Sequence, residues 1–101
     1  MPLTCIMTST KSSQVSWFKN SSEDNAVLAK NISDWTKLRP GLVSTEVDTP
    51  DENTWTFTIV FDTVDNYSDW RTSRVNLPEF QIRAAYNAAN GITSVVTESI
   101  T

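Results

Sequence analysis

Residues 55–61 are the feature that most limits what this chain can fold into. Large apolar residues alternate there with threonines and one valine, in the order Trp55, Thr56, Phe57, Thr58, Ile59, Val60 and Phe61. Side chains along a β-strand point alternately to the two faces of a sheet, so this spacing predicts a strand with one face in the core. The opposite face carries threonines and a valine and is therefore semi-polar.

The segments before this run predict a strand and a helix. Residues 3–8 alternate loosely and are rich in residues that suit a half-buried pleated surface. A helix is predicted from Asn20, where a capping side chain is followed by Glu23, and it ends by Pro40 because proline cannot continue the hydrogen-bond ladder. Residues 14–19 give no clear prediction. The helix has one apolar stripe that can lie on a sheet: Val27, Leu28, Ile32, Trp35 and Leu38.

The remaining segments predict a hairpin, a divided helical region and a last strand. Residues 42–47 and 54–61 are strand-like and flank a polar loop at 48–53, so they predict an antiparallel hairpin. A second helical region opens near Asp62 and is predicted to restart at Asn76, a capping residue followed by a proline tolerated in the first turn. It stops at Asn90-Gly91. Residues 92–100 predict a strand, either at an edge or exchanged.

This order of elements is βαββαβ, which predicts a ferredoxin-like α+β fold. We expect a four-stranded antiparallel sheet with the helices on one face and with the second helical region split in two. The chain has 101 residues, of which 39% are hydrophobic and 20% charged, so residues 1–101 are expected to form a single domain. A core of this size is modest, and a second subunit would add apolar burial.

Charge and composition argue against several classes of partner. The net charge is −4 and the basic residues are scattered, whereas nucleic-acid binding needs clustered lysine and arginine. The RNA-recognition motif has the same element order, but residues 54–61 lack the glycine and basic residues of that motif's third strand. Residues 1–10 show no signal peptide and no membrane span is predicted. We therefore expect a cytoplasmic protein with neither nucleic-acid nor membrane partners.

Residues that could hold a metal or a cofactor are sparse. The chain has no histidine, the usual general base and metal ligand near neutral pH, so no cofactor is expected. Cys5 lies within an alternating segment and is interpreted as a small buried hydrophobe. Four carboxylates gather near the hairpin, but their spacing fits no calcium loop, so a solvated turn is expected rather than a metal site: Glu46, Asp48, Asp51 and Glu52.

The aromatic third strand is followed by Tyr67-Ser68-Asp69-Trp70 and then by Leu77-Pro78-Glu79-Phe80. In this order the chain resembles the dimeric α+β barrel superfamily, which includes antibiotic-biosynthesis-type monooxygenases, stress-responsive barrel proteins and chlorite-dismutase-like domains. The resemblance covers nearly the whole chain. It implies a homodimer in which two sheets pack face to face, and a small-molecule cleft within each subunit between helices and sheet.

The resemblance also implies where a ligand would bind and which sheet face would meet the partner subunit. The ligand-binding residues that it implies are Asn31, Trp35, Trp55, Phe57, Tyr67 and Trp70, with the β-strand aromatics as the floor. Several of these residues also fit a structural role: the tryptophans of the helices as core, Asn31 as an exposed residue, and Tyr67 as a packing residue with its hydroxyl at the rim. No catalytic residue is assigned. The semi-polar face with Thr56, Thr58 and Val60 fits either a dimer interface or solvent exposure.

Three hypotheses about function remain open from the sequence. The first is a homodimeric barrel that binds a small apolar or aromatic ligand without turnover. The second is a cofactor-independent monooxygenase-like enzyme that positions an electron-rich phenolic substrate on the same scaffold. The third is a protein-interaction module without a ligand. A partly polar cavity with Tyr67 or Asn31 pointing inward favours the first two, and a space filled by tryptophans favours the third.

Overall fold

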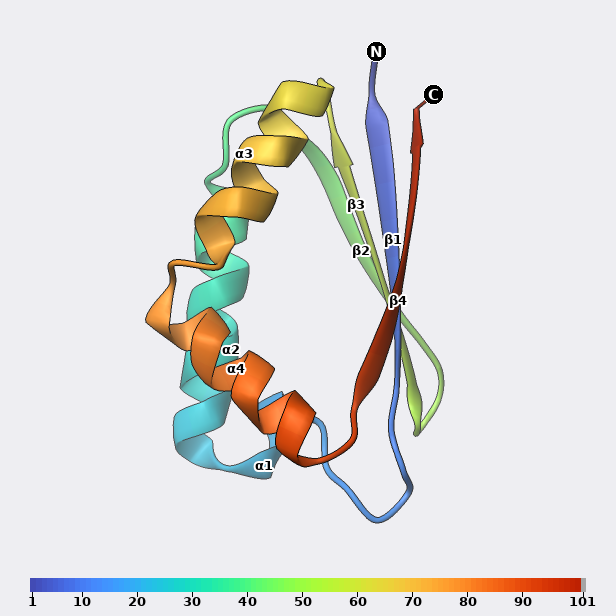
Figure 1. The fold of residues 1–101 in the computed structure, drawn as a ribbon, viewed down its shortest axis with the longest axis vertical. Coiled ribbons are helices and arrows are strands. Elements are labelled where there is room, and N and C mark those ends of the chain that lie inside the picture. Colours follow the sequence, from blue (N-terminus) through green and yellow to red (C-terminus); the bar gives the residue numbers. More distant parts are fainter. Residues whose placement is uncertain (101) are drawn as a thin grey trace.

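A computed structural model describes residues 1–100 and shows four antiparallel strands with all the helices on one face of the sheet (Figure 1). The strand order is β2-β3-β1-β4, which is the ferredoxin-like arrangement, so the predicted fold class is confirmed. The elements in chain order are β1 Leu3–Thr10, α1 Phe18–Ser21, α2 Glu23–Lys37, β2 Leu42–Asp51, β3 Thr54–Phe61, α3 Val64–Arg74, α4 Pro78–Ala89 and β4 Thr93–Ile100.

The core lies between α3 and the two central strands. In the antiparallel pairing of β1 with β3, Cys5 is opposite Ile59 and Leu3 is opposite Phe61. Both β3 residues are fully buried, as the alternation of that strand predicts. The buried cluster consists of these four residues and two aromatics from α3: Leu3, Cys5, Ile59, Phe61, Tyr67 and Trp70.

The first helical region begins differently from the prediction. The short helix α1 begins within the segment that gave no prediction, and α2 begins only after Ser22, whose hydroxyl accepts a hydrogen bond from the amide of Asn25. The predicted helix is therefore present, but its predicted start at Asn20 is wrong because Ser22 is the residue that caps α2. The apolar stripe is also narrower than predicted, since Val27 and Leu38 are exposed.

The hairpin is longer than the sequence predicts. Strand β2 runs to Asp51, so most of the predicted loop at 48–53 is strand, and the turn is closed by the Asp51 carboxylate, which accepts a hydrogen bond from the amide of Asn53. Pro50 is tolerated within β2 because this strand is at the edge of the sheet and its pairing is irregular between Asp48 and Asp51.

The second helical region forms two consecutive helices, as predicted. Thr63 caps α3 by accepting a hydrogen bond from the amide of Asn66, and Pro78 lies in the first turn of α4. The residue at the cap of α4 is Leu77, which makes no side-chain capping bond, so the predicted capping by Asn76 is wrong.

A glycine fixes the corner where the chain enters β2. Gly41 has a φ of 78°, and its carbonyl oxygen accepts a hydrogen bond from the amide of Asp62 at 2.9 Å. A side chain at position 41 would collide with the side chains of Asp62 and Asn66 at the start of α3. Only glycine combines this backbone conformation with this close approach.

The helix layer covers the sheet unevenly (Figure 1). Beneath α3 the strand residues are buried, whereas every residue of β4 is exposed and no residue of α4 is buried. Along the helix-facing side of the central strands, Met7, Trp55 and Phe57 are only partly buried. The space between sheet and helices is therefore closed beneath α3 and more open on the side of α4 and β4.

The opposite face of the sheet carries no helix (Figure 1). The register places Ile6 opposite Thr58, and Thr8 opposite Thr56, on this face. Ile6 is 37% exposed, and Thr56 and Thr58 are partly buried. The surface is therefore broad, semi-polar and uncovered. None of the helices in residues 1–100 has the length and apolar character needed to span a membrane.

Candidate functional site

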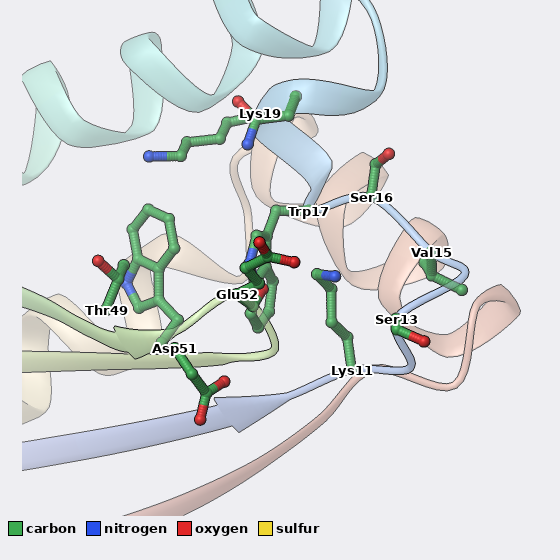
Figure 2. A pocket seen from close by; sticks show the side chains of 11 residues that line it. Lys11, Ser13, Val15, Ser16, Trp17, Lys19, Thr49, Asp51 and Glu52 are labelled. Carbon is green, nitrogen blue, oxygen red and sulfur yellow. The ribbon is translucent and has the colours of Figure 1, made fainter.

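A hollow of about 660 Å³ lies at the end of the sheet nearest α1, where the segment after β1 faces the β2–β3 turn (Figure 2). Trp17 and Trp55 form part of its wall, and their rings meet edge to face with centroids 5.9 Å apart. The indole of Trp17 is held by a hydrogen bond from Nε1 to the carbonyl oxygen of Glu52 at 3.1 Å. This volume is in the range of pockets that hold small molecules.

Charged side chains surround these two indoles. The Nζ atom of Lys19 lies 4.1 Å from the centre of the Trp55 ring, and that of Lys11 lies 5.6 Å from the Trp17 ring. Lys11 also donates to the Asn53 side-chain oxygen at 3.0 Å. Asp51 and Glu52 line the same hollow. The hollow therefore combines an aromatic wall with a polar rim of both charges.

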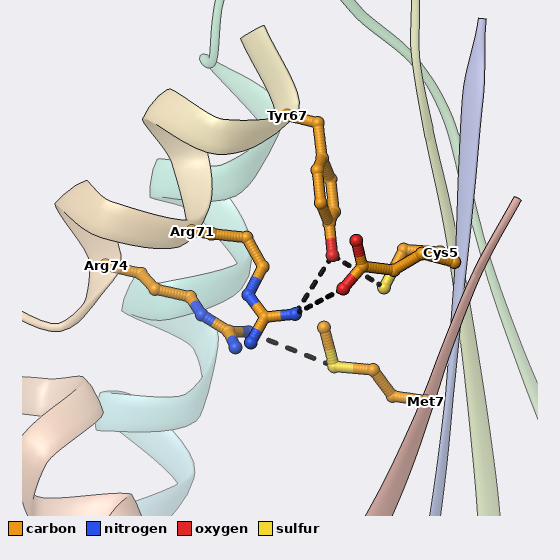
Figure 3. A network of polar contacts seen from close by, with 6 residues as sticks. Cys5, Met7, Tyr67, Arg71 and Arg74 are labelled. Carbon is orange, nitrogen blue, oxygen red and sulfur yellow. Dashed lines mark hydrogen bonds and ion pairs between the residues drawn. The ribbon is translucent and has the colours of Figure 1, made fainter. Parts of the chain in front are cut away.

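A second group of polar atoms lies between α3 and the sheet (Figure 3). The hydroxyl of Tyr67 points toward β1 and donates to the sulfur of Cys5 at 3.4 Å. Arg71 Nη1 donates to the Tyr67 oxygen at 3.0 Å and to the Glu98 carboxylate at 3.3 Å. Tyr67 therefore presents its polar atom to the interior rather than to solvent.

Burial and hydrogen bonding hold Tyr67 neutral. Burial, followed by the hydrogen bond to Cys5, raises the pKa of Tyr67 to about 12, and the hydrogen bond with Tyr67 raises the pKa of Arg71. At physiological pH the tyrosine keeps its proton and the arginine keeps its charge. The pair can donate hydrogen bonds to a ligand oxygen, but Tyr67 is not a general base.

Arg74 lies beside Arg71 in the same space (Figure 3). Its guanidinium carbon is 4.6 Å from the centre of the Trp70 ring and 4.8 Å from that of Phe80, while Arg83 lies 5.1 Å from the same Phe80 ring. Burial, with the nearby charges of Arg71 and Arg83, lowers the pKa of Arg74 to about 10. Aromatic faces, rather than carboxylates, surround these two arginines.

The structure brings together four of the six residues that the sequence assigns to ligand binding. They lie in or against the buried core: Trp35, Phe57, Tyr67 and Trp70. Trp55 lies two residues before Phe57 on the same side of β3 and lines the hollow. Asn31 is exposed on α2.

Sequence reasoning missed the arginines and the residues of the hollow before α1. Arg71 and Arg74 follow Tyr67 and Trp70 at four-residue steps, which places them on the same side of α3. This four-residue spacing is the sequence signal that could have identified the two arginines as site residues. Trp17 gave none, because residues 14–19 had no predicted conformation. In residues 1–100 no three acidic or cysteine side chains come close enough to hold a metal ion.

No protein-family model matches this chain, and no curated protein sequence matches it at a significant level. Solved structures do match. SnoaB, a cofactor-independent oxygenase from Streptomyces nogalater, gives a TM-score of 0.66 at 14% identity over 99% of this chain and 92% of SnoaB. An inferred antibiotic biosynthesis monooxygenase from Deinococcus radiodurans gives 0.66 at 14% identity, over 98% of this chain and 91% of that one.

The chain has the fold of antibiotic biosynthesis monooxygenase-like proteins. Rv0793 from Mycobacterium tuberculosis is similar as well, with a TM-score of 0.59 at 12% identity over the whole of this chain and 97% of that one. The likeness spans nearly all of each protein. The predicted resemblance is confirmed at the level of fold.

Proposed function

We propose that this protein is a homodimer that binds a small aromatic ligand between its helices and its sheet. The observation that carries the proposal is the contrast between the two halves of that space. Beneath α3 the strand residues are buried, whereas Phe57 and Trp55 are only partly buried and Trp55 lines the hollow of about 660 Å³. Partly buried aromatic faces beside a hollow offer stacking surface to a planar ligand.

A polar end to this surface would orient such a ligand. Tyr67 and Arg71 place a hydroxyl and a guanidinium between α3 and β1, where the surrounding side chains are largely apolar. A phenolic oxygen of the ligand can accept hydrogen bonds from both groups. An apolar body with one polar contact is the usual composition of a small-molecule site.

Titration of the purified protein with 2-naphthol, followed by tryptophan fluorescence and calorimetry, tests the binding. We expect saturable binding of one molecule per chain. The Trp55→Ala variant should bind about tenfold more weakly because it loses a stacking surface, while Lys30→Ala, on the exposed side of α2, should bind normally. Absence of saturation at millimolar 2-naphthol would overturn the proposal.

A second candidate function is cofactor-independent monooxygenation of a bound phenol. It is supported by the neutral Tyr67 beside the charged Arg71, and by the fold shared with SnoaB, which is a cofactor-independent oxygenase. A guanidinium near the phenol favours its anion, the electron-rich form that reacts with O₂. With 1,4-naphthohydroquinone, one oxygen atom would replace a ring hydrogen, the other would leave as water, and the product would be 2-hydroxy-1,4-naphthoquinone.

Incubation of 1,4-naphthohydroquinone with ¹⁸O₂ tests this chemistry. We expect an enzyme-dependent hydroxyquinone with one heavy oxygen, formed about tenfold or more slowly by Tyr67→Phe, because one hydrogen bond to the reacting oxygen is lost. Lys30→Ala is the control with unchanged rate. If only unlabelled 1,4-naphthoquinone forms, at the rate of spontaneous oxidation, the oxygenase candidate fails and the binding proposal remains separately testable.

The uncovered face of the sheet supports the homodimer. Its central residues Thr56, Thr58 and Val60 are partly buried within one chain, and neighbouring Ile6 is an apolar residue exposed on the same face. Light scattering should give twice the mass of one chain. Thr58→Glu places a charge in the middle of this face and should halve that mass, whereas Ser33→Glu on exposed α2 should not. A monomeric wild-type protein would refute the dimer.

A further inference from the structure

The space between α3, α4 and the sheet holds an excess of positive charge. Three arginines from the two helices lie in or beside it, Arg71, Arg74 and Arg83, and one carboxylate, that of Glu98, faces them. The chain as a whole carries a net charge of −4, so this local excess runs against its composition. Buried or partly buried charges are normally paired, so the excess requires an explanation.

Arg71 is paired, but the other two arginines are not. The ion pairs within residues 1–100 are Lys30–Asp34 and Arg71–Glu98, so neither Arg74 nor Arg83 has a carboxylate partner there. The Nη1 atom of Arg74 reaches only the thioether sulfur of Met7, at 3.9 Å, which is a weak acceptor.

Two buried donors in the described part of the chain lack an acceptor, and both belong to the same aromatic stack. They are Nε of Arg74 and Nε1 of Trp70. A buried N–H without an acceptor loses its hydration and gains no compensating hydrogen bond. The cation–π contacts with Trp70 and Phe80 replace only part of that hydration. The partly buried guanidinium of Arg74 therefore has donors left for an anionic group.

The position of Arg74 connects it to the proposed aromatic site. Met7, which contacts Arg74, is opposite Phe57 in the sheet, and Trp55 at the hollow is the next residue on that side of β3. A planar ligand lying along Phe57 would extend toward the guanidinium. Val96, opposite Met7 on the edge strand β4, is exposed, so this edge of the sheet is not buried.

We propose that Arg74 and Arg83 bind the carboxylate of an aromatic acid whose ring lies on Phe57. This inference rests on the proposed function and specifies the chemical class of its ligand. A guanidinium presents a flat fork of donors that matches the two oxygens of a carboxylate. Stacking on Trp70 and Phe80 fixes the plane of the Arg74 fork, so the acid is recognised by orientation as well as by charge.

The test compares 2-naphthoate with its neutral isostere 2-naphthamide by calorimetry at pH 7. Wild-type protein should bind the acid about tenfold to a hundredfold more tightly than the amide, as expected for hydrogen bonds to a charged group. Arg74→Met should abolish that preference, and Arg83→Met should reduce it. Arg39→Met is the matched control, because Arg39 also stacks on a tryptophan, Trp35, at 4.3 Å, and it should keep the full preference.

The ratio of the two affinities separates recognition from folding, because a general loss of structure weakens both ligands together. Equal binding of acid and amide by wild-type protein would refute the carboxylate site while leaving the aromatic site intact. A preference that survives in Arg74→Met would also refute it. If neither compound binds, the carboxylate site and the proposed function both fail.

Discussion

The half of the molecule beneath α3 and the half beside α4 are built on different physical principles. Beneath α3, Ile59 and Phe61 are completely buried and the aromatic rings of α3 pack against them. In the other half no residue of α4 itself is buried, strand β4 is exposed, and the partly buried Arg74 and Arg83 have no carboxylate partner within residues 1–100. One half provides folding stability, and the other half leaves surface and charge available for a ligand.

The largest expected effect compares equivalent substitutions in the two halves. Ile59→Ala removes a fully buried side chain and should lower the free energy of unfolding by about 2–5 kcal/mol. Ile82→Ala on α4, where the side chain is 47% exposed, should change it by about 0.5 kcal/mol or less. Urea unfolding followed by circular dichroism measures both. Similar losses at the two positions would show that the halves do not differ in this way.

Removal of the Tyr67 hydroxyl tests how much its hydrogen bonds, where the two halves meet, contribute to the free energy of unfolding. Tyr67→Phe loses hydrogen bonds with Arg71 and Cys5 and should lower the free energy of unfolding by about 1–2 kcal/mol near neutral pH. Urea unfolding at pH 8 gives this difference.

The same variant has a defined pH dependence. The pKa of Tyr67 is raised from its ordinary 10.0 to about 12 in the folded protein, so its contribution to stability is complete below pH 10 and is lost as the pH rises toward 12. The titratable groups that contact it, Cys5 and Arg71, are retained in both proteins. The difference between wild type and Tyr67→Phe should therefore shrink between pH 10 and 12. A constant difference would contradict this assignment.

The smallest expected effect distinguishes Arg71, which is paired with Glu98, from Arg74, which has no carboxylate partner within residues 1–100. Arg74→Met exchanges an uncompensated charge for an apolar side chain of similar length, and without ligand it should raise the free energy of unfolding by about 1 kcal/mol. Arg71→Met breaks bonds to Tyr67 and Glu98 and should lower it by about 1 kcal/mol. Thermal unfolding in a buffer without carboxylates compares them. Equal losses would mean that Arg74 is compensated in the free protein.

The sequence predicted the structure best where residues close together in the chain determine the conformation of their own segment. The period-two alternation of residues 55–61 correctly predicted which side of β3 is buried, and Pro78 correctly predicted a restart of the second helical region. It failed where the deciding contact is distant in sequence. Pro50 and its polar neighbours are typical of a loop, but position at the sheet edge allows them to extend β2.

The candidate site was harder to predict than the fold. Tyr67 and Trp70 were identified because their aromatic side chains follow the strongest strand and resemble a family pattern. Trp17 depends on contacts with Trp55 and Glu52, which lie far along the chain. Arg74 was missed because arginine on a helix is usually solvated, and its desolvation by Phe80 depends on how α3 and α4 pack.

The corner at Gly41 has a consequence for attempts to remodel this protein. The turn that leads into α3 meets this corner, because the side chains of Asp62 and Asn66 lie against Gly41 and the Asp62 amide donates to its carbonyl oxygen. Variant libraries at the partly buried aromatic residues of the proposed site, Trp55 and Phe57, should yield many folded proteins with altered ligand selectivity. Libraries that vary position 41 should yield few, because any other residue there must adopt a left-handed backbone with a φ of 78° and displace the side chains of Asp62 and Asn66.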